Sequence, residues 1–133
     1  MIVVDTNIIG YLYLNSERSG PAEQALRKDA EWAAPLLWRS ELRNVLALYV
    51  RKRHLPLHVA QEIMDQALGL MSGREYEVTS AQVLALAAGS ACSAYDCEFV
   101  ALARDLNATL VTVDKQVLAH FPDVAIGLDS YIR

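Results

Sequence analysis

Short apolar runs and longer amphipathic segments alternate along the chain. The apolar runs predict buried strands at Met1–Val4, Glu31–Pro35, Tyr76–Val78, Thr109–Val113 and Val124–Gly127. The amphipathic segments predict helices at Thr6–Leu14, Ala22–Ala30, Leu36–His54, Leu57–Met71, Ala81–Ser90 and Asp96–Leu106, and a short one that ends near His120. Because the strands alternate with helices, the pattern predicts a three-layer α/β domain with a mostly parallel sheet.

The segment boundaries are typical of helix caps and turns. Asp5 or Thr6 is placed to cap the first helix, and Ser93–Tyr95 is expected to form a loop from which Asp96 opens a later helix. The apolar stripe of the longest helix consists of Leu37, Leu42, Val45, Leu46, Tyr49 and Val50. The chain contains no internal repeat or linker, so residues 1–133 are expected to form one domain.

The composition is that of a globular protein, with 53% hydrophobic and 21% charged residues in a chain of 133. No apolar stretch is long enough to span a bilayer and the N-terminus does not resemble a signal peptide, so a cytoplasmic protein without membrane attachment is expected. Cys92 and Cys97 are expected to be buried and reduced, because the cytosol disfavours disulfides and the chain lacks the partners of a zinc site.

The net charge of −4 argues against a protein that only binds nucleic acid. It agrees better with an enzyme whose carboxylates bind divalent cations, because a bound cation can bridge the carboxylates and a phosphate. No serine or cysteine nucleophile paired with a histidine is apparent, and His54, His58 and His120 are expected at the surface.

Two acids occupy equivalent positions at the ends of predicted strands. Asp5 follows the run Ile2–Val4, and Asp114 follows Leu110–Val113. In a parallel α/β sheet, ligands bind beyond the carboxyl ends of the strands, so both carboxylates are expected at one edge. The alternative is that each aspartate only caps the helix that follows it.

Two further acids lie on predicted helices. Glu41 has apolar residues one turn away on either side, which places it near the buried stripe, and a buried carboxylate needs a metal or a cationic partner. Asp96 begins a helix, so a capping role alone is an alternative for it. Glu98 and Asp105 of the same helix are expected to be exposed.

Four acids in one cleft repel one another unless cations occupy the site. Ligation by carboxylates and water suits Mg²⁺ or Mn²⁺. Two such ions can bind a phosphodiester, activate water and stabilise the leaving oxygen. The four acids therefore predict phosphodiester hydrolysis without a protein nucleophile.

The four acids stand in motifs that resemble those of PIN-domain ribonucleases. The motifs are Val3–Asn7, Ser40–Val45, Ser93–Asp96 and Val111–Asp114, in the order and spacing of VapC-type toxins of prokaryotic toxin–antitoxin pairs. The resemblance covers essentially the whole chain and implies a PIN-like α/β/α domain with a five-stranded parallel sheet. It also implies an RNA-cleaving enzyme that holds Mg²⁺ or Mn²⁺ on Asp5, Glu41, Asp96 and Asp114.

Polar residues beside the acids match the family motifs as supporting groups. Thr6 and Asn7 follow the first acid, Ser93 precedes the third and Thr112 precedes the fourth. Each would orient a ligand or water, or would only form a cap or turn. Some relatives have a further acid or amide a few residues after the fourth acid. Here Gln116, Val117 and Leu118 follow and provide no extra carboxylate, so one tightly bound ion and a second that arrives with the RNA are expected.

The resemblance also implies partners. RNA would be the substrate, a small antitoxin would wrap the protein and block the acidic site, and the protein would form a homodimer. Arg39 and Arg43 share a helix face and are candidates to hold RNA phosphates, or are a solvated surface. Tyr11–Leu14 are candidates for an antitoxin or dimer surface, or for ordinary packing.

Two other functions fit parts of the pattern. A carboxylate-based phosphatase would also have an acid after its first strand, but it usually has a second Asp two residues later, where this chain has Asn7. A non-catalytic PIN-like scaffold that binds RNA or a partner would be expected to have lost some of the acids, whereas all four are present. Metal-dependent cleavage of RNA is therefore the predicted function.

Overall fold

Five short strands form the centre of the molecule in the computed structural model, which describes residues 1–133. The strands are β1 (Ile2–Val4), β2 (Trp32–Pro35), β3 (Glu75–Tyr76), β4 (Leu110–Thr112) and β5 (Ala125–Gly127). They form one sheet in the order β3-β2-β1-β4-β5, and every neighbouring pair is parallel. In the register, Val3 lies opposite Ala33 and Leu110, so β1 is the central strand. The predicted parallel sheet of five strands is confirmed.

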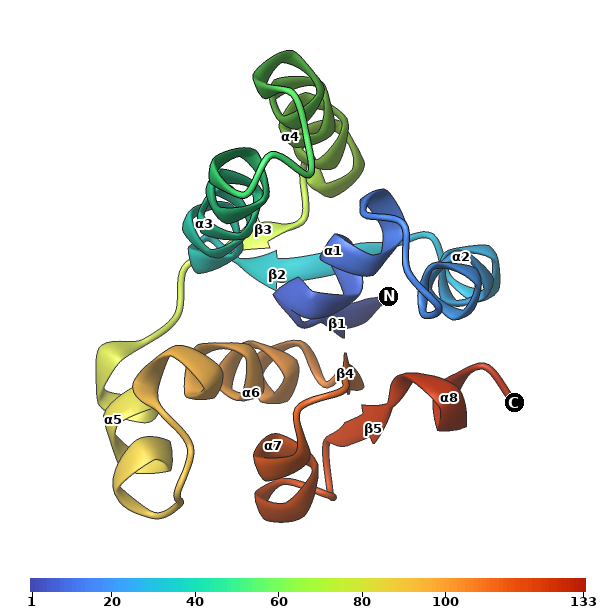
Figure 1. Cartoon of the computed structure of the whole chain (residues 1–133). Coiled ribbons are helices and arrows are strands. Elements are labelled where there is room, and N and C mark those ends of the chain that lie inside the picture. The colour runs from blue at the N-terminus through green and yellow to red at the C-terminus, as the bar shows by residue number, and fades with distance from the viewer.

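Eight helices cover the sheet, which gives the molecule three layers (Figure 1). The helices are α1 (Thr6–Tyr13), α2 (Ser19–Lys28), α3 (Leu37–Arg51), α4 (Leu57–Met71), α5 (Ser80–Ala88), α6 (Ala94–Leu106), α7 (Lys115–His120) and α8 (Leu128–Tyr131). Helices α1 to α4 pack together over one face, with α1 against β1 and α4 against β2. Helix α6 crosses β1, β2 and β4 on the other face, on the same side as α5 and α7. The predicted α/β/α architecture is therefore confirmed.

The core shows why the short apolar runs form strands. Val3 and Val4 are both fully buried, as expected of a parallel strand that is covered by helices on both faces. Ile8 and Ile9 of α1 and Trp32 of β2 belong to the same cluster of buried side chains. The central strand β1 is therefore held by apolar side chains on both faces, and Asp5 follows at its carboxyl end.

The buried face of α3 differs in part from the prediction. Leu42 and Leu46 are buried as expected, and so is Trp38, whose indole N–H donates a hydrogen bond of 2.8 Å to Glu75. Tyr49 is 37% exposed, so its assignment to the buried stripe was wrong. It lines a cavity that α1 and α3 share, instead of packing on the sheet.

Several element boundaries also differ from the prediction: α2 begins at Ser19 and not at Ala22, and β3 is Glu75–Tyr76 and not Tyr76–Val78. Ser93–Tyr95 is not a loop, because Ser93 is the N-cap of α6 and accepts a hydrogen bond of 3.1 Å from the backbone N–H of Asp96. Asp96 therefore lies inside the first turn of α6 and does not cap it. Helix α8 was not predicted, because four residues are too few to show a helical period.

Several predictions about single residues have clear outcomes. Cys92 and Cys97 are buried free thiols, and the three histidines are exposed, all as expected. Leu14 is only 7% exposed, so it belongs to the core and not to a surface available to a partner. None of the eight helices combines the length and the apolar character needed to cross a membrane.

Candidate active site

The first and fourth acids lie where the crossovers of the chain diverge. From β1 the chain crosses to β2, and from β4 it crosses in the opposite direction to β5. Such a switch point leaves a crevice beyond the carboxyl ends of the two central strands. Asp5 directly follows β1 and caps α1, and Asp114 caps α7 two residues after β4. Each central strand therefore brings one carboxylate to the crevice.

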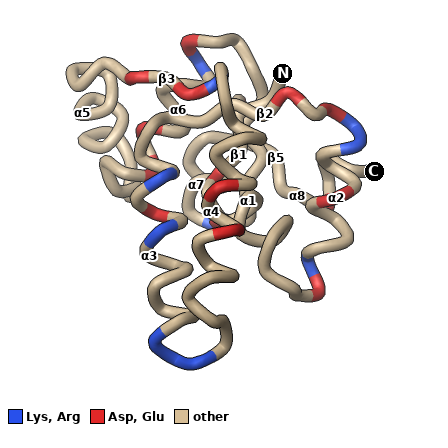
Figure 2. The backbone as a smooth tube through the Cα atoms, turned by 90° about the horizontal axis from the view of Figure 1, so that it is seen from above, with Lys and Arg blue, Asp and Glu red and all other residues tan.

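All four predicted acids line one cavity of about 340 Å³. Asp5 and Asp114 come from the ends of the central strands, Glu41 from α3 and Asp96 from α6. Figure 2 shows acidic segments of several elements near α1, whereas the basic loop between α3 and α4 lies at the far edge of the molecule. No group of three or more His, Cys, Asp or Glu side chains is close enough together to hold one metal ion. The four carboxylates therefore share the cavity without forming a preassembled ligand set.

Two threonines connect three of the acids through their hydroxyls and the backbone N–H of Thr6. Thr112 Oγ1 donates to Asp5 Oδ2 (2.7 Å) and accepts from the backbone N–H of Asp114 (3.0 Å). Thr6 Oγ1 donates to Glu41 Oε1 (2.7 Å), and its backbone N–H donates to Asp5 Oδ1 (2.8 Å). Both threonines are buried. The hydroxyls thus fix the orientation of two carboxylates and join three elements in one hydrogen-bonded chain.

Burial and mutual repulsion raise the pKa values of three acids. Burial raises the pKa of Asp5 from 3.8 to about 6, although the hydrogen bonds from the two threonines oppose this, and the charges of Glu41 and Asp96 add to the rise. Burial is also the main cause that raises the pKa of Glu41 and that of Asp96, where the charge of Asp114 contributes further. No lysine or arginine offsets these shifts, so the cavity concentrates negative charge that a divalent cation would neutralise.

Two of the predicted supporting residues differ in what they contact. Asn7 lines the cavity, and its buried Oδ1 has no hydrogen-bond partner. An unpaired buried acceptor costs about 1–3 kcal/mol, so a donor or a cation is expected to approach this atom. Ser93 does not line the cavity, because its hydroxyl is used to cap α6. It acts on the site only by fixing the start of the helix that carries Asp96.

The two arginines predicted to hold RNA phosphates do not line the acidic cavity. Arg39 forms a bidentate ion pair with Glu75, and both N···O distances are 2.6 Å. Arg43 lies with Arg51 beside a mostly apolar groove between α3 and α4. Both predicted residues are two positions away from Glu41, and that spacing turns them to the other side of the helix. Their placement argues against direct contact with a phosphate at the four acids.

Two features of the site were not predicted. Tyr11 and Tyr49 line the cavity, and the guanidinium of Arg18 lies 5.4 Å from the ring centre of Tyr11 and donates a hydrogen bond of 2.8 Å to its hydroxyl. Glu98, which was expected to be exposed, is half-buried, and its charge contributes to the raised pKa of Glu41. No local sequence signal marks either feature, because both depend on contacts between separate elements.

Replacing Thr112 with valine is expected to disturb the site with little change in side-chain shape. Thr112→Val would leave Asp5 Oδ2 without a donor and the backbone N–H of Asp114 without an acceptor. The free energy of unfolding should fall by about 1–3 kcal/mol. Groups that hydrogen-bond to metal ligands contribute roughly 10- to 100-fold to affinity, so Mg²⁺ should bind more weakly by that factor.

Chemical denaturation and calorimetry measure these two effects. Thr109→Val is the matched control, because Thr109 is exposed and lies immediately before β4. If the two variants had the same free energy of unfolding and the same affinity for Mg²⁺, the hydroxyl of Thr112 would have no special role in the site.

The fold and the cavity together define a class of protein: an α/β/α domain with acidic residues at the switch point of a parallel sheet. The chain belongs to the PIN domain family, whose sequence model matches residues 2–125. The resemblance seen in the four motifs is therefore confirmed at the level of the family.

Known proteins similar to this chain agree with that assignment. Ribonuclease VapC3 of Pyrobaculum aerophilum is 29% identical over 124 residues, which cover 91% of this chain and 95% of the relative. The crystal structure of PAE2754 from the same organism matches with a TM-score of 0.78 at 20% identity and covers 98% of this chain and 92% of that one. A toxin–antitoxin complex from Klebsiella pneumoniae matches with a TM-score of 0.73 at 20% identity, over 96% of this chain and 98% of the other. The two structural matches show that the fold is shared.

Proposed function

We propose that this protein is a metal-dependent endoribonuclease and the toxin of a VapBC-type toxin–antitoxin pair. The main observation in support is the convergence of Asp5, Glu41, Asp96 and Asp114 on one cavity, in a chain similar to ribonuclease VapC3 over most of its length. An acidic site of this kind suits hydrolysis of a phosphodiester by a water molecule. RNA is the substrate that the name of the relative favours.

The residues of the cavity fit Mg²⁺ or Mn²⁺. All candidate ligand atoms are oxygens, which these cations prefer. The raised pKa of Asp5 and the unpaired Oδ1 of Asn7 are both features that a bound cation would relieve. The ion would be held by Asp5, Glu41, Asp96 and Asp114. Because these carboxylates are not preassembled around one point, binding would bring them closer together.

Residues of the chain would position the reacting groups. A bound Mg²⁺ or Mn²⁺ would supply activation of a water molecule and neutralisation of charge on the phosphate. Thr6 and Thr112 hold Glu41 and Asp5 in place by their hydroxyls. Asp114 uses Oδ1 to accept two backbone N–H groups at the start of α7, which leaves Oδ2 for the site. The capping role and the ligand role of Asp114 are therefore compatible.

The partners are part of the same proposal. A solved toxin–antitoxin complex with the same fold supports an antitoxin as partner. We propose that this antitoxin covers the acidic cavity. We further propose that the protein forms a homodimer and that it meets both RNA and antitoxin in the cytoplasm. These assignments rest on the family and not on a contact within the chain.

The direct test is cleavage of labelled RNA by purified, antitoxin-free protein. Transfer, ribosomal and messenger RNA are each incubated with Mg²⁺, with Mn²⁺ and with excess EDTA, and the products are separated on gels. We expect cleavage with either cation, none with EDTA, and recovery when the cation is restored. Equal cleavage with and without EDTA would contradict a metal-dependent enzyme. Intact RNA under all conditions would favour a non-catalytic PIN-like scaffold.

A further inference from the structure

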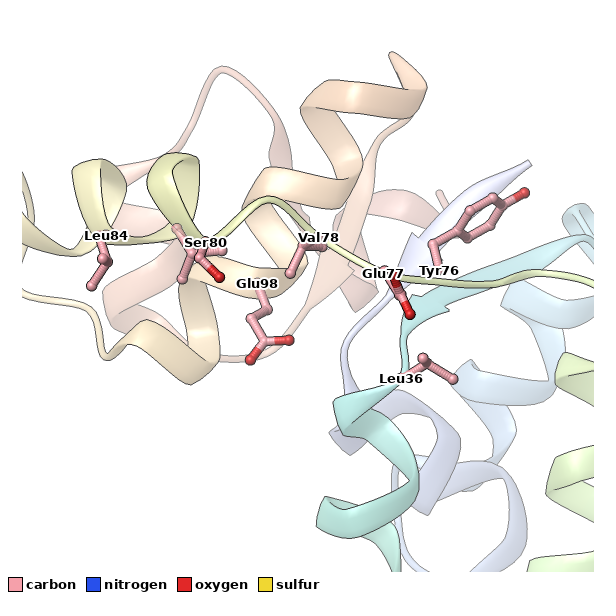
Figure 3. A pocket seen from close by; sticks show the side chains of 8 residues that line it. Leu36, Tyr76, Glu77, Val78, Ser80, Leu84 and Glu98 are labelled. Carbon is pink, nitrogen blue, oxygen red and sulfur yellow. The ribbon is translucent and has the colours of Figure 1, made fainter.

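A second cavity lies beside the acidic one. It measures about 520 Å³ and is open to solvent between the start of α3, the segment that joins β3 to α5, and the helices α5 and α6 (Figure 3). Its lining includes Leu36, Glu77, Val78, Ser80, Leu84 and Glu98. In Figure 3 the side chain of Glu98 extends from α6 on one side of the opening, and those of Glu77 and Leu36 lie on the other side. A volume of this size is typical of small-molecule sites.

The second cavity continues the acidic one along the same edge of the sheet. Leu36 follows β2 and Glu77 follows β3, so both lie at the carboxyl ends of strands, as Asp5 does. Helix α6 borders both cavities, because it carries Asp96 of the acidic cavity and Glu98 of the second one on different sides. The charge of Glu98 also contributes to the raised pKa of Glu41 in the acidic cavity. Helix α3 begins at one cavity and brings Glu41 to the other. A strand of RNA whose phosphate lies at the acids can therefore extend along this edge of the sheet to the second cavity.

The side chains of the second cavity suit a base and not a phosphate. No lysine or arginine is among the eight lining residues, whereas Glu77 and Glu98 are, so the side chains of the cavity would repel a phosphate. Leu36 and Leu84 are 42% and 65% exposed, which provides apolar surface for the faces of a flat ring. The carboxylate of half-buried Glu98 only accepts hydrogen bonds, so a ligand must offer N–H groups at its edge.

Guanine fits this combination best among the four bases. Its Watson–Crick edge carries two adjacent N–H donors, at N1 and N2, which match the two oxygens of one carboxylate. Adenine and cytosine offer one amino group on that edge, and uracil offers one imino group. The hydroxyl of Ser80 can donate to the O6 acceptor of guanine. Unpaired bases in RNA are commonly read by such contacts to their Watson–Crick edge.

We propose that this cavity binds one unpaired guanine of the RNA next to the cleaved bond, with Glu98 accepting hydrogen bonds from its edge. The proposal rests on the proposed ribonuclease function and adds a specificity site to it. It assigns a role to a carboxylate that the four-acid site does not use.

The test compares RNA substrates that differ by one amino group. Cleavage sites in mixed RNA are mapped first, and a guanosine next to the cleaved bond is then replaced by inosine, which lacks the N2 amino group. For the unmodified protein, kcat/KM should be about 10-fold lower with inosine, because inosine loses one of the two hydrogen bonds to the carboxylate. The variant Glu98→Gln should cleave both substrates at nearly equal rates. Asp105→Asn, on an exposed position of the same helix, should keep the 10-fold ratio.

The outcomes separate this proposal from the ribonuclease function. If RNA is cleaved without regard to guanine, or if Glu98→Gln keeps the ratio, the base site is refuted while the nuclease stands. If no RNA is cleaved, both are refuted. The alternative is that the exposed leucines form a protein–protein interface, and sedimentation of the Leu84→Asp variant tests it. A dimer that this substitution splits without changing the guanosine-to-inosine ratio would show that the cavity is a protein interface and refute the proposal.

Discussion

Replacing Asp5 with asparagine is expected to lower RNA cleavage by more than about 100-fold, which exceeds the loss typical of a residue that only supports a metal ligand. Asp5 lies at the end of the central strand, lines the acidic cavity and is hydrogen-bonded through both carboxylate oxygens. Asparagine has nearly the same shape and is also a favoured N-cap, so α1 should keep its start. The substitution therefore removes the charge and leaves the fold. Initial rates on labelled RNA with Mg²⁺ measure the effect.

The control for this experiment is Asp105→Asn, which removes one carboxylate from an exposed position of α6. It should cleave RNA at the rate of the unmodified protein. That result would show that the change in net charge does not cause the loss of cleavage in Asp5→Asn. Asp5→Asn protein that is folded by circular dichroism and still cleaves within a few-fold of the original rate would rule out Asp5 as a metal ligand.

The sequence was sufficient to predict most of the fold, because four of the five strands are short apolar runs next to helices. The exception is β3 (Glu75–Tyr76), which was predicted at Tyr76–Val78. The start of α6 was harder, since Ser93 and Asp96 are both favoured N-caps and only the observed hydrogen bond shows which one caps the helix. Helix α8 contains only four residues and packs against α2 and β5, so contacts across the fold stabilise it more than its local pattern does.

The acidic site was predictable for a similar reason. Asp5 and Asp114 follow strands, and Glu41 lies among apolar residues of its helix, so each position has a local signal. The residues that surround the site have no such local signal in the sequence. Arg39 was a candidate for RNA binding, but its partner Glu75 is 36 residues away in sequence and reaches it only through the fold. Such pairings depend on the three-dimensional arrangement.

The electrostatics of the cavity explain how an unassembled ligand set can still favour a cation. The hydroxyls of Thr6 and Thr112 each donate to one carboxylate, but the pKa of Asp5 and that of Glu41 remain raised in spite of them. The hydrogen bonds therefore fix the side chains without neutralising their charge. In the absence of a cation the folded protein keeps an unfavourable concentration of charge, and this has a measurable consequence for stability.

The metal-free protein is expected to lose stability relative to Asp5→Asn as the pH rises from about 4 to about 7. In the folded state the pKa of Asp5 is raised from 3.8 to about 6. Below pH 3.8 Asp5 is protonated in both the folded and the unfolded state, so it does not change the free energy of unfolding. Between the two values the folded state binds more protons, so stability falls with rising pH, and above about 6 the full cost is present. Two pKa units correspond to about 3 kcal/mol.

Urea denaturation in EDTA across this pH range measures the difference between the two proteins. The difference between the two curves includes the repulsion of Asp5 by Glu41 and Asp96, because their charges add to the raised pKa of Asp5. Titratable groups outside the cavity contribute to both curves and largely cancel. Parallel curves would show that the carboxylate of Asp5 is well solvated. Addition of Mg²⁺ at pH 7 should then stabilise the unmodified protein by about 2.7 kcal/mol at a concentration 100 times its Kd, and Asp5→Asn by much less. The charge that destabilises the metal-free fold is thus the same charge that would bind the ion.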